Sequence, residues 1–121
     1  MKKGLTLILF LAFSILTNNS KAQLPTNQDC LGAIPISLGQ YYTTQSYVGT
    51  GNYPNEINNG ISCLGSGERN DVWYSFTPNA NGYLNFTIAP NNPADDYDWA
   101  VYDITGVTCA DIYISPAYEK S

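Results

Sequence analysis

The stretch from Asn70 to Asp103 decides which fold class this sequence predicts. It reads Asn70-Asp-Val-Trp-Tyr-Ser-Phe-Thr77, a turn, Tyr83-Leu-Asn-Phe-Thr-Ile-Ala89, a loop of Pro, Asn and Asp, and then Tyr97-Asp-Trp-Ala-Val-Tyr-Asp103. Short runs rich in aromatic and β-branched residues, separated by turn residues, are typical of an antiparallel meander. The stretch therefore predicts strands at 72–77, 83–89 and 99–102.

Alternation within these runs predicts which side chains face a core. Apolar residues recur at every second position, as in strands that bury one face. Trp99 and Val101 are expected to pack toward Phe76 and Phe86. The predicted core residues are Tyr74, Phe76, Leu84, Phe86, Trp99 and Val101. We therefore expect an all-β protein with antiparallel strands.

The flanking segments fit the same interpretation. Residues 34–38 alternate and predict a strand, in which Pro35 indicates an edge position or a bulge because proline donates no hydrogen bond to a ladder. Residues 41–48 are expected to form a second strand, and 49–67 a long polar loop. Residues 109–112 fit a single helical turn, and 112–114 the start of another strand.

The N-terminus has the pattern of a secretory signal peptide at residues 1–22. Two lysines precede a short apolar run from Leu5 to Leu16, and small residues precede the expected cleavage site after Ala22. N-terminal sequencing of exported protein is then expected to begin at Gln23. The apolar run is shorter than the roughly 20 residues that span a bilayer, although an uncleaved anchor is the alternative. The chain is expected to be secreted or held at the outer cell surface.

Removal of residues 1–22 leaves an acidic chain. The remaining chain contains two basic residues, Arg69 and Lys120, and ten acidic residues, which gives a net charge of −8. So few basic groups cannot neutralise a run of phosphates, which excludes nucleic acid as a partner. Anionic membrane surfaces are disfavoured for the same reason, and cations are plausible ligands.

The three cysteines all follow the signal peptide, in an exported and oxidising context. We expect a disulfide between Cys30 and Cys63, which would tie the N-terminal segment to the loop before residue 72. Cys109 would then pair with a cysteine beyond Ser121 or remain a buried free thiol. A zinc site is not expected, because the sequence contains no histidine and no Cys-x-x-Cys motif.

Three segments together resemble a known family. They are Asn27 to Ile36, Cys63 to Phe76 with its Asp-Val-Trp-Tyr-Ser-Phe run, and Asp95 to Asp103. They are similar to an N-terminal β-sandwich module of exported Bacteroidota surface proteins, of the pre-peptidase C-terminal jelly-roll type. The resemblance implies a longer parent protein with further domains, exported by type IX secretion. It also implies that residues 30–121, after an exposed lead-in at 23–29, form a module that is incomplete at its C-terminus. It implies no catalytic residues.

Two sets of side chains are candidate binding sites. Closely spaced carboxylates suit calcium, and the candidate ligands are Asp95, Asp96, Asp98 and Asp103. The alternative is that these aspartates only shape turns. A possible exposed aromatic surface for carbohydrate or protein consists of Tyr41, Tyr42, Tyr47 and Tyr53.

Catalysis is not expected. Without histidine, Ser-His and Cys-His nucleophile systems are absent. The sequence thus predicts a non-catalytic exported module of a larger cell-surface or secreted protein, with an adhesive, ligand-binding or spacer role. An accessory domain of a secreted protease or glycosidase, and a carbohydrate-binding module in its own right, are the alternatives.

Overall fold

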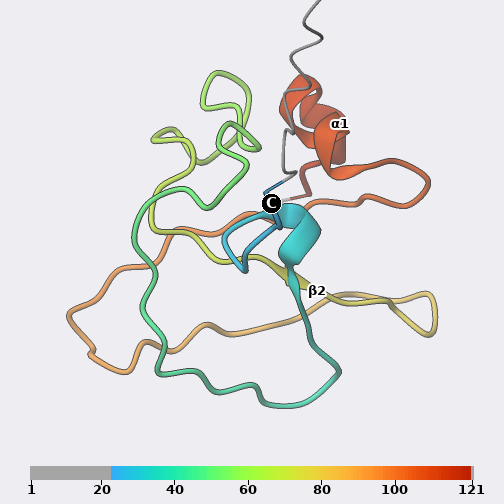
Figure 1. Cartoon of the computed structure of the whole chain (residues 1–121). Coiled ribbons are helices and arrows are strands. Elements are labelled where there is room, and N and C mark those ends of the chain that lie inside the picture. The colour runs from blue at the N-terminus through green and yellow to red at the C-terminus, as the bar shows by residue number, and fades with distance from the viewer. Residues whose placement is uncertain (1–22, 121) are drawn as a thin grey trace, which may run out of the picture.

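The computed structural model describes residues 23–120, so the predicted signal peptide lies outside the described residues. The elements in chain order are the 3-10 helix η1 (Cys30–Gly32), β1 (Ile34–Pro35), β2 (Tyr74–Ser75), α1 (Cys109–Ile114) and the 3-10 helix η2 (Pro116–Tyr118). Figure 1 shows η1 and β2 near the centre and α1 to one side, joined by long irregular runs. Within residues 23–120, no helix is long and apolar enough to cross a membrane.

The predicted all-β sandwich is wrong. Strands β1 and β2 form one two-stranded parallel sheet, with Ile34 opposite Tyr74 and Pro35 opposite Ser75. Within the strand predicted at 72–77, only β2 is present, and within the strand predicted at 34–38, only β1 is present. The predicted strands at 41–48 and 83–89 are absent. Tyr102 makes a single antiparallel bridge with Glu119. Alternation marks the two faces of a strand but supplies no pairing partner, and pairing is a contact between segments distant in sequence.

Proline is accommodated in β1 because of its position in the ladder. The backbone N–H groups of Ile34 and Ile36 donate to the carbonyl oxygens of Trp73 and Ser75, each at 2.8 Å. Pro35 lies between these donors, where no N–H is required. The predicted edge position of Pro35 is confirmed, since β1 has β2 as its one neighbour in this sheet.

A small core surrounds the disulfide between Cys30 and Cys109. Ile112 of α1 is 3% exposed beside the two cysteines, and Trp73 and Tyr102 pack against this cluster. The ring centroids of Trp73 and Tyr102 lie 5.7 Å apart. The disulfide therefore holds η1 against α1, although 79 positions of sequence separate them.

The predicted Cys30–Cys63 disulfide is wrong. Cys30 and Cys109 lie 5.8 Å apart between their Cα atoms, within the range that a disulfide spans. Cys63 is instead a free, exposed thiol, and its Sγ lies 3.8 Å from the carbonyl oxygen of Trp99. Cys30 is the first residue of η1 and Cys109 the first residue of α1, so the disulfide joins two helix starts.

Helix α1 begins at a capping interaction. The Asp111 carboxylate accepts the backbone N–H of Thr108 at 2.7 Å and its hydroxyl at 2.8 Å. This satisfies a donor at the helix start, and it places Cys109 in the first turn. The predicted helical turn at 109–112 is confirmed, whereas the strand predicted to begin at 112 is wrong because α1 continues to Ile114.

The core takes the opposite face of the predicted strands. Alternation placed Tyr74 and Val101 toward the core, but Trp73 and Tyr102 occupy those places. A shift of one residue moves every side chain of a strand to the other face. The disulfide-linked cluster decides which face is buried, and the other face is left open. The side chains that were predicted as core but are exposed by 36% to 47% are Tyr74, Phe76, Leu84, Phe86 and Trp99.

Candidate functional site

Asp29 is the most deeply buried polar side chain among the described residues, at 0% exposure. Its carboxylate accepts the backbone N–H groups of Asn52 and Tyr53, each at 2.7 Å, and the hydroxyl of Thr26 at 2.7 Å. The backbone N–H of Thr26 also donates to it. Burial acts to raise the pKa of Asp29, but these hydrogen bonds together outweigh it and lower the pKa. The end of the predicted exposed lead-in is thus a buried anchor.

Gly51 allows the backbone to approach this carboxylate. Its φ is +72°, a conformation that other residues adopt at a cost, and a Cβ placed there would lie 2.4 Å from Oδ1 of Asp29. The two N–H donors to Asp29 follow directly in the chain. Glycine at position 51 therefore makes the Asp29 anchor possible.

Three further carboxylates, those of Glu56, Glu68 and Asp71, lie around Asp29, and we call the four the acidic cluster. Oε2 of Glu56 accepts the backbone N–H of Cys30 at 2.8 Å, and Oε2 of Glu68 accepts that of Glu56 at 3.0 Å. Burial, followed by repulsion from Glu68, Asp29 and Asp71, raises the pKa of Glu56 to about 7. Burial is also the first cause that raises the pKa values of Glu68 and Asp71.

The acidic cluster is electrostatically strained. Oε1 of Glu68 and Oδ1 of Asp71 are buried without a hydrogen-bond partner, which is costly for a charged oxygen. In the described part of the chain, no group of three or more carboxylates or cysteines is arranged to hold a metal ion. The arrangement can instead take up protons as the pH falls. Sequence reasoning missed it, although Thr26-x-x-Asp29 matches the capping pattern found again at Thr108-x-x-Asp111.

A second candidate site lies on the face that the core leaves open. The phenyl ring of Phe86 meets the indole of Trp99 edge to face, with centroids 4.9 Å apart. This contact confirms the predicted approach of Trp99 to Phe86. Trp99 shares a hollow with Ile88 and Tyr97. Tyr41 packs on Tyr74 at 5.3 Å between ring centroids.

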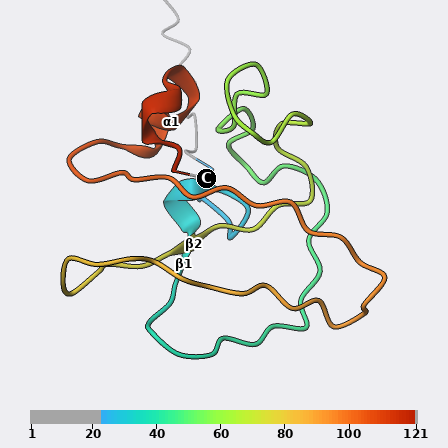
Figure 2. The ribbon, with the colours of Figure 1, turned by 180° about the vertical axis from the view of Figure 1, so that it is seen from behind.

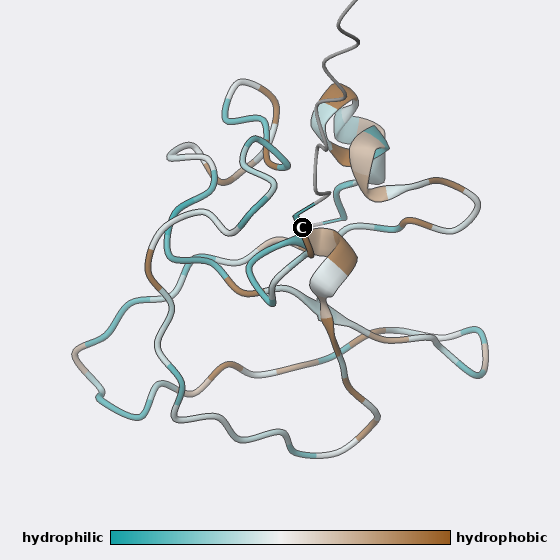
Figure 3. Ribbon diagram, viewed as in Figure 1, coloured by the Kyte–Doolittle hydropathy of each residue, from teal (hydrophilic) through white to brown (hydrophobic). Residues whose placement is uncertain are grey.

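We call this group of side chains, each 36% to 55% exposed, the open aromatic surface; it consists of Tyr41, Tyr74, Phe86, Ile88, Tyr97 and Trp99. Burial raises the pKa of Tyr74, and the neighbouring hydroxyls of Tyr41, Tyr47 and Tyr97 raise it further. The Tyr41–Tyr74 pair therefore lies close to Tyr97. Figure 2 shows, from behind, the long excursion of residues 76–100 that carries most of this surface. Figure 3 shows hydrophobic residues spread along the irregular runs as well as on η1 and α1.

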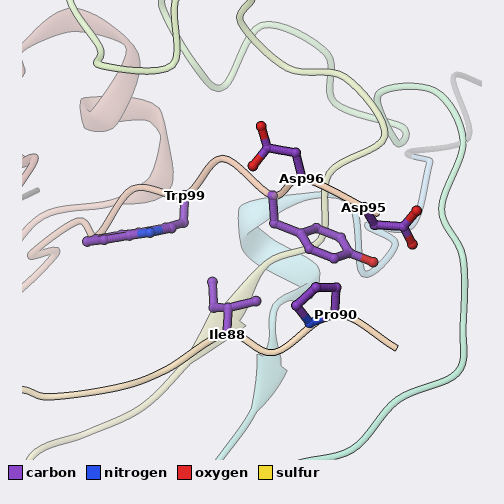
Figure 4. Close-up of a pocket in the computed structure, with 6 residues that line it drawn as sticks. Ile88, Pro90, Asp95, Asp96 and Trp99 are labelled. Carbon is purple, nitrogen blue, oxygen red and sulfur yellow. The ribbon is translucent and has the colours of Figure 1, made fainter. Parts of the chain in front are cut away.

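The hollow beside Trp99 measures about 200 Å³. Residues from two runs of chain line it, Ile88 and Pro90 from one and Asp95, Asp96, Tyr97 and Trp99 from the other. Figure 4 shows Trp99 above Ile88, while the carboxylates of Asp95 and Asp96 extend away from Ile88 and Pro90. Apolar side chains and carboxylates thus line the same hollow, and most of its exposed lining is polar.

The structure brings together only part of the candidate calcium set. Asp95 and Asp96 share the hollow, whereas Asp98 and Asp103 do not line it. Asp103 accepts the backbone N–H of Thr105 at 3.0 Å, which is a turn-shaping role. Asp95 accepts the side-chain amide of Asn92 at 3.1 Å. Calcium binding stays a prediction.

The four candidate tyrosines do not form one surface. Tyr41 belongs to the open aromatic surface and Tyr47 lies near its Tyr74. Tyr42 is 81% exposed and bonds Gln40 through its hydroxyl. Tyr53 lies elsewhere, at the Asp29 anchor, where its hydroxyl donates to the carbonyl oxygen of Gln23.

Comparisons with other proteins identify no relative: no family model, no curated protein and no solved structure matches this chain. The resemblance to β-sandwich modules of exported surface proteins therefore stays a prediction.

Proposed function

We propose that this chain is a non-catalytic binding module of a larger exported protein, either secreted or at the cell surface. Its ligand, a protein or a carbohydrate, binds at the open aromatic surface. The signal-peptide pattern at residues 1–22 supports the export of the chain. The acidic charge of the remainder argues against nucleic acid and anionic membranes as partners.

The continuity of the open aromatic surface carries this proposal. Single exposed apolar residues are normal on any protein. Here Phe86, Trp99, Ile88 and Tyr97 are linked by a ring contact and a shared hollow while each stays 47% to 55% exposed. Contiguous exposed apolar side chains mark interaction sites, and aromatic rings dominate the energy of such interfaces.

The test is a binding screen of the full chain, recovered after export, on glycan and peptide arrays. Trp99→Ala and Phe86→Ala are expected to abolish binding to any ligand found. Tyr83→Ala is the matched control, because Tyr83 is an aromatic residue that is 99% exposed and does not line the hollow. A ligand bound equally well by all three variants would contradict the assignment of the surface, and turnover of an array ligand would contradict a non-catalytic role.

A further inference from the structure

A second hollow lies between the long polar loop at 49–67 and α1. It measures about 210 Å³, and most of its exposed lining is polar. Figure 1 shows the loop in green beside α1, and the side-chain amide of Asn58 joins the two by donating to the carbonyl oxygen of Tyr113 at 3.0 Å. The polar residues that line this hollow are Thr50, Asn55, Asn59, Ser66, Glu68 and Tyr113. None of them belongs to the open aromatic surface.

Glu68 gives this hollow a buried acceptor that the protein does not fully use. The residue is 8% exposed, and its Oε2 accepts the backbone N–H of Glu56 at 3.0 Å. Oε1 is buried without a hydrogen-bond partner in the described part of the chain. Buried polar groups in folded proteins nearly always have a partner, and a missing one costs free energy. A donor from outside the chain is therefore expected at the Glu68 carboxylate.

The other lining residues offer hydrogen-bonding groups of both kinds. Hydroxyls donate and accept, and side-chain amides carry an oxygen acceptor beside two N–H donors. Within residues 23–120, the side chains of Asn55, Asn59 and Ser66 have no hydrogen-bond partner. Ile57, which is 7% exposed, and Tyr113, which is 39% exposed, add apolar surface. An occupant with several hydroxyl groups and an apolar face fits this lining.

Charge and size narrow the class of occupant. No basic side chain lines the hollow, and Asp29 and Asp71 add to the negative potential at Glu68, so an anion is repelled. Calcium affinity rises with the number of charged ligands, and Glu68 is the one acid among the described residues that line the hollow. The volume is below the roughly 300–1,000 Å³ of pockets that take drug-sized ligands. A single neutral ring therefore fits better than an anion, a cation or a larger molecule.

We propose that this hollow binds one neutral pyranose ring at the end of a glycan. A hydroxyl of the ring donates to the Glu68 carboxylate, and neighbouring hydroxyls exchange hydrogen bonds with Asn55 and Asn59. The C–H face of the ring lies toward Ile57 and Tyr113. Asn55 and Asn59 are exposed, so the hollow opens to solvent and the glycosidic bond leaves on that side. The site is additional to the open aromatic surface, and the inference does not rest on the proposed function.

The experiment is an NMR titration of the isotope-labelled full chain, recovered after export, that follows the side-chain amide signals of Asn55 and Asn59. The probes are the methyl α-pyranosides of glucose, galactose and mannose, with cyclohexylmethanol as a six-membered ring that carries one hydroxyl. We expect at least one glycoside to shift both signals saturably in the millimolar range, as the usual free energy per atom of a small ligand implies. Cyclohexylmethanol should bind about tenfold more weakly because it makes fewer hydrogen bonds. Failure of all three glycosides, or equal binding of cyclohexylmethanol, would overturn the proposal.

Variants test which residues hold the ring. Asn59→Ala is expected to weaken glycoside binding about fivefold, and Glu68→Gln about tenfold because the hydrogen bond to Glu68 involves a charged oxygen. Asn79→Ala is the matched control and should leave binding unchanged, since Asn79 is an exposed amide that does not line the hollow. Asn59 is exposed, so its replacement tests the site even where Glu68→Gln fails to fold. Equal effects of Asn59→Ala and Asn79→Ala would contradict the proposed site.

Two further outcomes would assign the hollow or the sugar differently. If calcium chloride shifts the two amide signals and no glycoside does, the hollow is a cation site and the proposal is wrong. It is also wrong if a glycoside shifts the Trp99 indole signal and leaves the amides of Asn55 and Asn59 unmoved, because the sugar then binds at the open aromatic surface. A free hexose that binds more tightly than its methyl glycoside would overturn the assignment to a glycan.

Discussion

Replacing Glu56 with glutamine is expected to change how the stability of the protein depends on pH. The pKa of Glu56 is about 7 in the folded chain against an ordinary value of 4.5. Between these values the folded state binds a proton that the unfolded state has released, so stability falls as the pH rises. Glutamine keeps an oxygen that can accept the Cys30 N–H but removes the charge beside Glu68, Asp29 and Asp71.

The magnitude follows from the two pKa values. At 1.36 kcal/mol for each tenfold change, the full difference corresponds to roughly 3 kcal/mol. Because the Glu56 side chain is partly exposed, solvent screening reduces the expected effect to about 1–2 kcal/mol. Glu56→Gln should therefore be more stable than the parent chain by that amount at about pH 8, and equally stable at about pH 4.5.

The assay is urea unfolding across this pH range with the disulfide intact. The raised pKa values of Glu68 and Asp71 act with the same sign and remain in the variant, so the pH dependence is reduced and not abolished. Asp29, whose pKa is lowered, affects stability only under more acidic conditions. Asp98→Asn, which removes an exposed carboxylate, is the control. Parallel stability curves for Glu56→Gln and the parent chain would refute the reasoning.

Two further predictions concern the elements that hold the fold. Non-reducing peptide mapping should find Cys30 linked to Cys109 and Cys63 open to alkylation in the native protein. The linkage spans 79 positions and contributes about 4.5 kcal/mol to stability by the chain-entropy model. A disulfide-linked Cys63 would contradict the structure. Gly51→Ala should destabilise the chain by about 2–4 kcal/mol in urea unfolding, because the added methyl group crowds the Asp29 carboxylate. Gly49 also has a positive φ but has open space around it, so Gly49→Ala should cost about 1–2 kcal/mol. Equal losses of stability would show that crowding is unimportant.

Local signals in this sequence were read correctly where the structure they specify is itself local. The helical turn at Cys109 depends on nearby residues and is confirmed. The edge position of Pro35 is also confirmed, and it was predictable because proline itself has no N–H to donate to a ladder. The contact between Phe86 and Trp99 was also predicted, from the faces of two expected strands, and it is present although neither residue lies in a strand.

Contacts between segments that are distant in the sequence could not be predicted in the same way. Alternation at 72–76 is compatible with burial of either face, and the disulfide to Cys109 selects Trp73 over Tyr74. The acidic cluster draws Asp29 and Glu68 together from either side of a long polar loop, where spacing along the chain carries no information on proximity. The one usable signal was the Thr26-x-x-Asp29 pattern, which predicts an ordered carboxylate where an exposed lead-in was expected.

The account depends most on Trp99 lying in an open surface that a ligand can reach. A Trp73→Phe variant leaves Trp99 as the one tryptophan, so that its fluorescence and its quenching by acrylamide can be measured directly. With 47% of the side chain exposed, we expect a red-shifted emission maximum and efficient quenching in the folded protein. A blue-shifted maximum with emission protected from acrylamide would place Trp99 in a closed core and would contradict the account.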